Sequence, residues 1–371
     1  MKEQKILFVS PDYKELGRWL KENQTGKIFL VCGRFIRFFT VNDYLHQFCK
    51  KEGIEIVRFD DFAPNPLYES AVKGAELFRA RGCDCMIAIG GGSAMDVAKC
   101  IKLFSTMDSG TNYLEQEKAA NHIPFLAMPA TAGTGSESTR YAVIYFEGAK
   151  QSVTDNSMIP EMVLLDADML ETLPLYQRKA TLLDALCHAA ESFWSLNSTA
   201  QSREYSRKAL ELVMANMDGY LAHDRRSSRN MLIAANLAGR AINIAQTTAG
   251  HAMCYKITSL FGIAHGHAAA LCNRKLFAWM VRNTGKCIDP RGEKYLKDVF
   301  LKIGQAMGCR SAQAAAGKLE AVFEKLELEV PQASAEQFEI LRNSVNTVRL
   351  ENHPAALDNQ TIDMLYHEIL W

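Results

Sequence analysis

The run from Thr247 to Leu271, TTAGHAMCYKITSLFGIAHGHAAAL, constrains this chain more than any other stretch. It brings three histidines and a tyrosine close together: His251, Tyr255, His265 and His267. Upstream, within a helical pattern, DALCH places Asp184 and His188 four residues apart. This spacing puts both side chains on one face of a helix, close enough to hold one ion.

A carboxylate with two or three imidazoles suits Zn²⁺ or Fe²⁺ and is too rich in nitrogen for Mg²⁺ or Ca²⁺. A single histidine on an apolar helix is more often a core residue, but the setting here favours a ligand. Gly262 and Gly266 bracket His265, so the backbone can turn sharply there. If the two stretches meet in the fold, the chain is a metalloenzyme; the spacing alone leaves this open.

Length and composition narrow the class of protein. The 371 residues suffice for about two domains. The 42 basic and 42 acidic side chains balance, which argues against binding to nucleic acid or a membrane surface. Ten scattered cysteines without a CxxC pair predict reduced thiols in a cytoplasmic protein. Neither a signal peptide nor a run of about 20 apolar residues is found, so we expect no membrane segment.

The first half of the chain alternates short apolar runs with helical patterns. The runs are Ile28–Val31, Ile54–Val57, Cys85–Ile89 and Phe125–Met128, and the helical patterns are Val41–Lys51, Leu67–Arg81 and Ala94–Phe104. Such alternation predicts a parallel sheet covered by helices on both faces. Two further extended runs follow, at Tyr141–Phe146 and Met162–Leu165.

Beyond Pro174 only helical patterns remain, such as Ala180–Trp194, Glu204–Tyr220 and Met231–Ala245. The change in periodicity predicts a boundary near Leu175. We therefore expect an α/β domain over residues 1–175 and an all-helical domain over residues 176–371.

Two glycine-rich turns carry the chemistry of the first half. IAIGGGSAMDVAK places Gly90–Ser93 between a strand and a helix, where backbone amides can bind a diphosphate. The turn is neither a P-loop nor a GxGxxG fingerprint. The segment PATAGTGSES follows the next strand. Each turn alone can be a tight connection that binds nothing, but two at one edge of a parallel sheet predict a nucleotide crevice.

Together these motifs resemble the iron-containing alcohol dehydrogenase family, nearly from end to end. The matching blocks are PNP at Pro64–Pro66, the GGGS–D–AK pattern from Gly90 to Lys99, PATAGTGSE at Pro129–Glu137, DALCHAAES from Asp184, GHAM from Gly250 and HGHA from His265. The resemblance implies a dinucleotide-binding α/β domain and a helical metal-binding domain, with the site in the cleft between them.

The resemblance also implies roles for individual residues. The expected metal ligands are Asp184, His188, His251 and His265. The residues expected to contact a nicotinamide cofactor are Asn65, Gly91, Gly92, Ser93, Thr131, Thr134 and Lys150. A homodimer is expected, and iron and zinc are equally compatible with the ligand set.

This chain departs from the family pattern at two positions. Tyr255 stands where many relatives have a histidine, and with a pKa near 10 a tyrosine relays protons poorly at neutral pH. We take Tyr255 as a hydrogen-bond donor and His267 as a substitute relay. Gly33 stands where relatives that prefer NAD have an aspartate, and Arg34 follows it. Without that carboxylate the 2′-phosphate of NADPH is not repelled, so NAD(P)H is expected.

The sequence around the histidines is similar to that of the phosphonoacetaldehyde reductases, a branch of the family. The predicted reaction is the metal-dependent, NAD(P)H-linked reduction of a small aldehyde to a primary alcohol, with a phosphonate-bearing substrate as the specific form. Arg140 and Lys150 are the predicted partners of the phosphonate. The alternatives are a general short-chain alcohol dehydrogenase, the similarly built dehydroquinate synthases and glycerol-1-phosphate dehydrogenases, and a non-catalytic nucleotide- or metal-binding protein.

Overall fold

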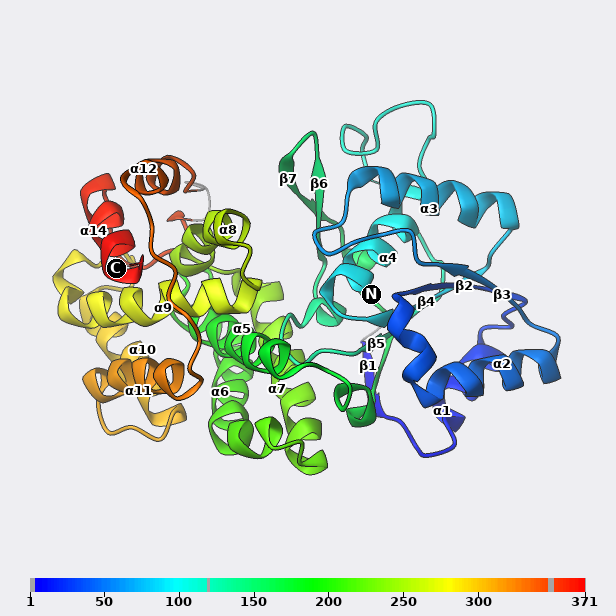
Figure 1. Ribbon diagram of the computed structural model, residues 1–371, viewed down its shortest axis with the longest axis horizontal. Coiled ribbons are helices and arrows are strands. Elements are labelled where there is room, and N and C mark those ends of the chain that lie inside the picture. Colours follow the sequence, from blue (N-terminus) through cyan, green and yellow to red (C-terminus); the bar gives the residue numbers. More distant parts are fainter. Residues whose placement is uncertain (1–3, 119–120, 346–349, 371) are drawn as a thin grey trace. The chain divides into compact units, whose positions relative to one another are not determined.

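The computed structural model describes residues 4–118, 121–345 and 350–370 and divides the chain into two compact units (Figure 1). The sheet domain comprises Met1–Thr131 and Gly135–Leu173, and the helical domain comprises Ala132–Thr134 and Pro174–Trp371. The chain thus passes into the helical domain at Pro174, close to the change in periodicity in the sequence. The short piece Ala132–Thr134 belongs to the helical domain, which the sequence does not indicate.

The sheet domain is built on six parallel strands, as predicted. Their order across the sheet is β1 (Lys5–Phe8), β8 (Met162–Leu165), β5 (Phe125–Pro129), β4 (Cys85–Gly90), β2 (Lys27–Cys32) and β3 (Glu55–Phe59). Strand β1 and the helix after it, α1 (Lys14–Glu22), were not predicted from the sequence. Strand β1 lies at the sheet edge and is only partly buried, so it lacks a strong apolar signal.

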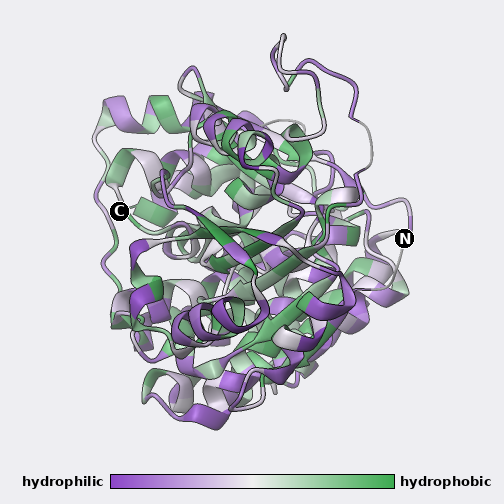
Figure 2. Cartoon of the chain, turned by 90° about the vertical axis from the view of Figure 1, so that its right-hand side faces the viewer, coloured by the Kyte–Doolittle hydropathy of each residue, from purple (hydrophilic) through white to green (hydrophobic). Residues whose placement is uncertain are grey.

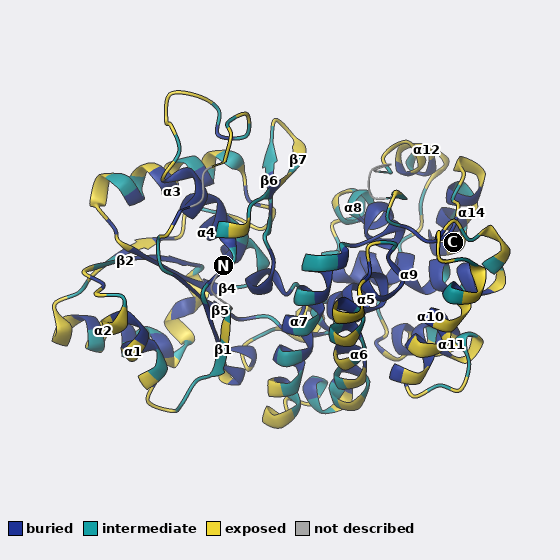
Figure 3. Cartoon of the chain, turned by 180° about the vertical axis from the view of Figure 1, so that it is seen from behind, coloured by how far each residue is buried: buried dark blue, intermediate teal, exposed yellow. Residues whose placement is uncertain are grey.

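Helices cover both faces of this sheet, because the buried strands are apolar on both sides. Alternate residues of β2 separate the two cores: Ile28 and Leu30 face α1 and α2 (Thr40–Glu52), while Phe29 and Val31 face α3 (Tyr68–Arg81) and α4 (Gly92–Phe104). The strands are accordingly mostly green in the hydropathy view (Figure 2), and the sheet interior is dark blue in the burial view (Figure 3). The predicted fold class is confirmed.

An antiparallel hairpin stands apart from this sheet. Strands β6 (Tyr141–Phe146) and β7 (Ala149–Thr154) are joined through Glu147 and Gly148, whose φ angles are 50° and 74°. Two successive positive φ values are typical of the tight turns that match the twist of a hairpin. The sequence indicated β6 but not β7, since β7 carries mostly polar residues.

A buried lysine fixes the segment that precedes the hairpin. Lys99 of α4 is fully buried, and its Nζ donates to Ser136 Oγ at 2.9 Å, Thr139 Oγ1 at 3.0 Å and Tyr141 O at 2.8 Å. Ser136 Oγ in turn donates to Asp96 Oδ1 at 2.7 Å. Burial lowers the pKa of Lys99 to about 8, against the opposing effect of the Asp96 charge, and burial raises the pKa of Asp96. This Asp96–Ser136–Lys99 chain attaches the second glycine-rich turn to α4.

The helical domain contains α5 (Leu175–Trp194), α6 (Ala200–Leu221), α7 (Arg225–Ala245), α8 (Ala249–Phe261), α9 (His265–Arg282), α10 (Glu293–Ala306), α11 (Ala312–Lys325), α12 (Ala335–Asn343) and α14 (Asn359–Leu370). Helix α5 is buried along most of its length and packs against α6, α7 and α9. Apart from an isolated bridge between Cys287 and Ala355, the described part of this domain has no β-structure, as predicted. None of the described helices is long and apolar enough to cross a membrane.

A buried histidine in the helical domain should make the stability of the protein sensitive to acid. His353 is 1% exposed, neither ring nitrogen has a hydrogen-bond partner among the described residues, and burial lowers its pKa to about 4. Since an unfolded histidine titrates near 6.5, the unfolded state gains a proton first as the pH falls. The free energy of unfolding should therefore drop by about 2 kcal/mol between pH 7 and pH 5.

Urea unfolding of wild type and His353→Met at these two pH values tests this expectation. The variant should lose less stability on acidification, because it lacks the His353 imidazole, which takes up its proton on unfolding. Equal losses in both proteins would assign the acid sensitivity to other groups.

Candidate functional site

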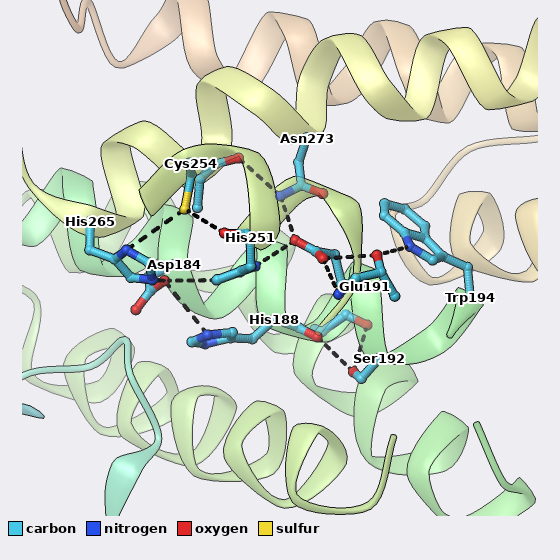
Figure 4. A network of polar contacts seen from close by, with 12 residues as sticks. Asp184, His188, Glu191, Ser192, Trp194, His251, Cys254, His265 and Asn273 are labelled. Carbon is cyan, nitrogen blue, oxygen red and sulfur yellow. Dashed lines mark hydrogen bonds and ion pairs between the residues drawn. The ribbon is translucent and has the colours of Figure 1, made fainter. Parts of the chain in front are cut away.

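Three helices of the helical domain bring the predicted metal ligands together. Asp184 and His188 stand one turn apart on α5, His251 lies in the first turn of α8, and His265 begins α9 (Figure 4). A Cβ on Gly266 would lie 2.0 Å from Ala180 O and 2.6 Å from Asp184 Cβ. Only glycine therefore allows α9 to approach α5 so closely, and this approach places His265 beside Asp184.

The three imidazoles converge on a single carboxylate oxygen. The Nε2 atoms of His251, His188 and His265 lie 3.6, 3.8 and 4.0 Å from Asp184 Oδ1. These distances exceed a hydrogen bond. Ligand atoms held at about 2.1 Å around a tetrahedral ion are separated by about 3.4 Å, so the spacing suits ligands of one ion.

Two buried atoms at this centre support the same interpretation. Asp184 Oδ1 and His251 Nε2 are buried without a hydrogen-bond partner among the described residues. Leaving such atoms unsatisfied costs about 1–3 kcal/mol each, and a divalent cation would satisfy both. The donor set therefore fits the Fe²⁺ or Zn²⁺ that the sequence predicts.

The centre has a closed side and an open side. The donor atoms of Asp184, His188 and His251 all lie within 4.8 Å of one another, and these residues are 2%, 6% and 1% exposed. The side chain of His265 is 37% exposed. Any ion held here would be reached from the side of His265, as a catalytic rather than a structural metal requires.

The charges of the centre favour a cation. Burial would raise the pKa of Asp184, but the neighbouring imidazoles hold it well below its usual range. Burial also opposes charge on His251, yet Glu191 and Asp184 raise its pKa to about 9. For His188, burial prevails and lowers the pKa. Two carboxylates around one imidazole thus favour positive charge at this point of the domain.

One further residue of this centre, Glu191, was not predicted from the sequence. It lies on the same face of α5, one turn beyond His188, and its Oε1 is 2.5 Å from His251 Nδ1. Burial would raise the pKa of Glu191, but His251 and further hydrogen-bond donors lower it to about 2. The signal was present in the sequence, because residues 184, 188 and 191 follow the i, i+4, i+7 spacing of one helix face.

The two glycine-rich turns meet in the sheet domain. Gly90 pairs with Pro129, and Ala130 N donates to Gly90 O at 2.8 Å. A Cβ on Gly91 would lie 3.2 Å from Thr131 Cγ2. Gly92 and Ser93 form the first turn of α4, whose N-cap, Gly91, makes no side-chain cap. Such a helix start offers unpaired backbone N–H groups to an anion.

The strand order places a third predicted residue beside these turns. The strand order reverses direction between β2 and β4. Open α/β sheets bind ligands at such a switch point. Gly33 follows Cys32, which pairs with Ile89 just before the first glycine-rich turn. Arg34 is exposed at the start of the 3₁₀ turn η1 (Arg34–Phe38). The first glycine-rich turn and Gly33, both parts of the predicted nucleotide site, therefore border the same switch point.

Comparison with known proteins decides the family. The family described as "Iron-containing alcohol dehydrogenase" matches residues 3–167, and the one described as "Fe-containing alcohol dehydrogenase family, C-terminal" matches residues 179–370. The chain belongs to the iron-containing alcohol dehydrogenase family. The resemblance seen in the sequence is confirmed. The prediction of an enzyme of the alcohol dehydrogenase and aldehyde reductase type is confirmed with it.

Three relatives are similar to this chain over most of its length. Alcohol dehydrogenase 4 of Schizosaccharomyces pombe is 31% identical over 71% of this chain, which spans 62% of that protein's length. NADPH-dependent butanol dehydrogenase of Clostridium saccharobutylicum is 31% identical (68% of this chain, 67% of that protein). Phosphonoacetaldehyde reductase of Streptomyces viridochromogenes is 30% identical (81% and 80%). Among solved structures, sulfoacetaldehyde reductase of Bifidobacterium kashiwanohense in complex with NAD⁺ matches with a TM-score of 0.87 at 23% identity, covering 100% of this chain and 98% of that one.

The two residues predicted to donate a hydrogen bond or relay a proton, Tyr255 and His267, lie in different surroundings. The Tyr255 ring stacks on His265, with centroids 5.4 Å apart and planes at 12°, so it borders the open side of the centre. His267 is 1% exposed, with Nδ1 3.2 Å from Tyr176 Oη and Nε2 2.9 Å from Glu329 O. Both of its nitrogens are thus engaged in the domain interior. A relay through His267 stays a prediction that these contacts do not support.

The remaining residues predicted to contact the cofactor lie in two domains. Asn65, with φ 57°, lies in the turn before α3, and the next residue, Pro66, accepts a hydrogen bond from Tyr145 N. Lys150 pairs with that same Tyr145 across the hairpin, so Asn65 and Lys150 are neighbours in the sheet domain. Thr134 belongs to the helical domain, where the adjacent Gly133 packs against Thr181 of α5.

The predicted phosphonate partners do not lie together. Arg140 precedes the first rung of the hairpin, whereas Lys150 lies at the rung of Tyr145. At about 3.4 Å per residue the two backbone positions are about 17 Å apart. The Arg140 guanidinium donates to Tyr141 Oη through Nε at 3.2 Å and Nη2 at 3.0 Å. The hairpin therefore does not present Arg140 and Lys150 as a joint clamp on one anion.

Proposed function

We propose that this chain reduces a small aldehyde to a primary alcohol with NAD(P)H and a divalent metal, Fe²⁺ or Zn²⁺, at Asp184, His188, His251 and His265. The observation that carries the proposal is the convergence of three Nε2 atoms on Asp184 Oδ1. When bound, the ion would act as a Lewis acid on the carbonyl oxygen and the nicotinamide would supply the hydride. Assembly as a homodimer and a cytoplasmic location stay predictions.

The residues of the chain have separate tasks in this proposal. Asp184 and the three imidazoles hold the ion, with its open side at His265. Gly91, Gly92 and Ser93 offer backbone N–H groups to the cofactor diphosphate at the start of α4. Tyr255, stacked on His265, is the side chain placed to donate a hydrogen bond to a substrate oxygen.

Turnover of the purified protein tests the proposed function. The absorbance of reduced nicotinamide is followed with a panel of short aldehydes, before and after removal of metal, and again after addition of Fe²⁺ or Zn²⁺. Activity should disappear with the metal and return with one of the two ions. Full activity of metal-free protein in chelator would overturn the proposal.

Cofactor choice is expected to depend on Gly33. Its backbone is extended (φ −75°), and a Cβ there meets no atom within 4 Å, so aspartate can replace it without strain. The wild type should accept NADPH, consistent with the NADPH dependence of the butanol dehydrogenase relative. Gly33→Asp should shift the ratio of kcat/KM toward NADH by about tenfold or more, through repulsion of the 2′-phosphate.

Gly285→Asp is a matched control, because Gly285 also has open space around its Cα but lies in the helical domain. This control should keep the wild-type ratio of kcat/KM values. A wild type that uses NADH alone would contradict the role given to Gly33.

For the substrate, similarity to the phosphonoacetaldehyde reductase favours an aldehyde with a phosphonate group. Because Arg140 and Lys150 lie apart, Arg140 alone is the proposed partner of the anion. A charge-assisted hydrogen bond contributes about 1.5–3 kcal/mol. Phosphonoacetaldehyde should thus exceed propionaldehyde in kcat/KM by about tenfold or more, and Arg140→Met should remove most of that preference.

Arg81→Met serves as the charge-matched control, since Arg81 ends α3 at the opposite, amino-terminal edge of the sheet. Equal kcat/KM values for both aldehydes on the wild type would favour the second candidate, a general short-chain alcohol dehydrogenase. A preference that persists in Arg140→Met would place the anion partner elsewhere.

A further inference from the structure

Glu191 is the most completely satisfied carboxylate around the proposed metal centre. It is 0% exposed. Its Oε1 meets His251 Nδ1 at 2.5 Å and accepts from Asn273 Nδ2 at 2.8 Å. Its Oε2 accepts from the backbone N of Thr248 at 2.6 Å and from Thr248 Oγ1 at 2.9 Å. Four donors on one buried carboxylate fix its position and leave it little freedom to turn.

These donors come from the helices that carry the ligands. Glu191 belongs to α5, Asn273 to α9, and Thr248 is the N-cap of α8. A Cβ on Gly250 would lie 2.4 Å from the Asn273 amide, so the glycine lets α8 approach this network. Trp194 Nε1 donates to Thr248 Oγ1 at 2.9 Å and closes it on the outer side (Figure 4). One carboxylate therefore joins the three helices that supply Asp184, His188, His251 and His265.

Among the described residues, the Glu191 carboxylate has no basic partner other than a histidine. In the described part of the chain neither a lysine nor an arginine forms an ion pair with it, and only His251 does. Asn273 and Thr248 are neutral donors. A buried negative charge without a full countercharge is costly, so the compensating positive charge must lie on or beyond the His251 ring.

The far side of that ring is the proposed metal position. With Nδ1 bound to Glu191, the other nitrogen, Nε2, points toward Asp184 Oδ1 at 3.6 Å. A carboxylate on Nδ1 selects the tautomer whose Nε2 lone pair is available to an ion and makes that lone pair more basic. Asp184 and Glu191 together carry two negative charges, which equals the charge of one divalent cation.

We infer that Glu191 is a positioning residue for the metal: it orients His251 Nε2 and supplies the second negative charge that balances a divalent ion. The inference rests on the proposed function, since it presumes that Asp184 and the three histidines bind the ion. It adds a residue that binds neither the ion nor the substrate directly but determines how strongly the ion is held.

Metal affinity of the full-length protein, independent of turnover, provides the test. Metal-free wild type, Glu191→Gln and Glu320→Gln are titrated with Co²⁺, and both the dissociation constant and the visible spectrum of the cobalt protein are recorded. Glu320 is a matched control, because it is a carboxylate of the same domain that binds Arg274 and Lys275 instead. Melting of the metal-free proteins reports on folding separately.

Glu191→Gln should weaken Co²⁺ binding by about 10- to 100-fold and change the cobalt spectrum, the usual effect of losing an outer partner of a metal-bound histidine. Glu320→Gln should bind as the wild type does. Glu191→Gln disturbs several contacts at once, because a glutamine amide cannot accept from all four donors. Thr248→Val removes one donor and keeps the carboxylate, so it should weaken Co²⁺ binding less than Glu191→Gln does. This variant also provides the test if Glu191→Gln does not fold.

The outcomes separate the two proposals. Wild-type affinity and spectrum in Glu191→Gln, or in Thr248→Val where Glu191→Gln does not fold, would overturn the role of Glu191 while leaving the metal enzyme intact. A wild type that binds no Co²⁺ would overturn the proposed function itself. A weaker affinity together with an unchanged melting temperature of the metal-free protein would establish positioning rather than support of the fold.

Discussion

Replacing His251 with alanine is expected to abolish bound metal and to lower kcat by about 10³-fold or more. His251 is the ligand nearest to Asp184 Oδ1, and its second nitrogen is held by Glu191. The variant loses one donor and leaves the buried charges of Asp184 and Glu191 without their shared imidazole. Lewis-acid stabilisation of a developing oxyanion is worth several kcal/mol, and each 1.36 kcal/mol is a factor of ten in rate.

Metal analysis and steady-state turnover, compared with His46→Ala, measure this loss. His46 is an exposed histidine of the sheet domain, so its removal should change neither quantity. Binding of NADPH by His251→Ala, followed by nicotinamide fluorescence, should persist because the glycine-rich turns after β4 and β5 are untouched. Wild-type metal content in the variant would show that His251 is not a ligand.

Replacing Lys99 with methionine is expected to destabilise the sheet domain by about 3–5 kcal/mol, the usual cost of removing one partner of a buried charge pair. The variant removes three hydrogen bonds to the segment Ser136–Tyr141 and the larger of the two lysine charges, Lys99 and Lys150, that stabilise the Asp96 carboxylate. Because the segment continues the turn that contains Thr131, NADPH binding should weaken as well.

The double variant Lys99→Met/Asp96→Asn is the matched comparison, since it restores neutrality without restoring the hydrogen bonds. It should recover part of the lost stability, because it no longer leaves a negative charge at position 96 without Lys99. Urea unfolding of the three proteins gives these free energies. A single variant as stable as the wild type would mean that Lys99 contributes no net stabilisation.

Much of the local structure was accessible from the sequence. Apolar runs placed β2, β3, β4 and β5, and the apolar residues on both faces of β2, β4 and β5 predicted a sheet buried on both faces. The i, i+4 spacing placed Asp184 and His188 on one helix face, and extending it to i+7 would have added Glu191. The glycines at Gly90–Gly92 marked a strand-to-helix turn, and Gly90, with a φ angle of 155°, adopts a backbone conformation that few other residues adopt.

The tertiary structure decided what local patterns do not contain. It brought His265 to Asp184 through a close approach at Gly266, assigned Thr131 and Thr134 to different domains, and separated Arg140 from Lys150 along a hairpin. Periodicity and turn chemistry act within a few residues, so they specify helices, strands and the faces that these bury. Which segments then meet depends on how those faces pack, because a distance between residues far apart in the chain is set by side-chain volumes and strand order rather than by any local preference.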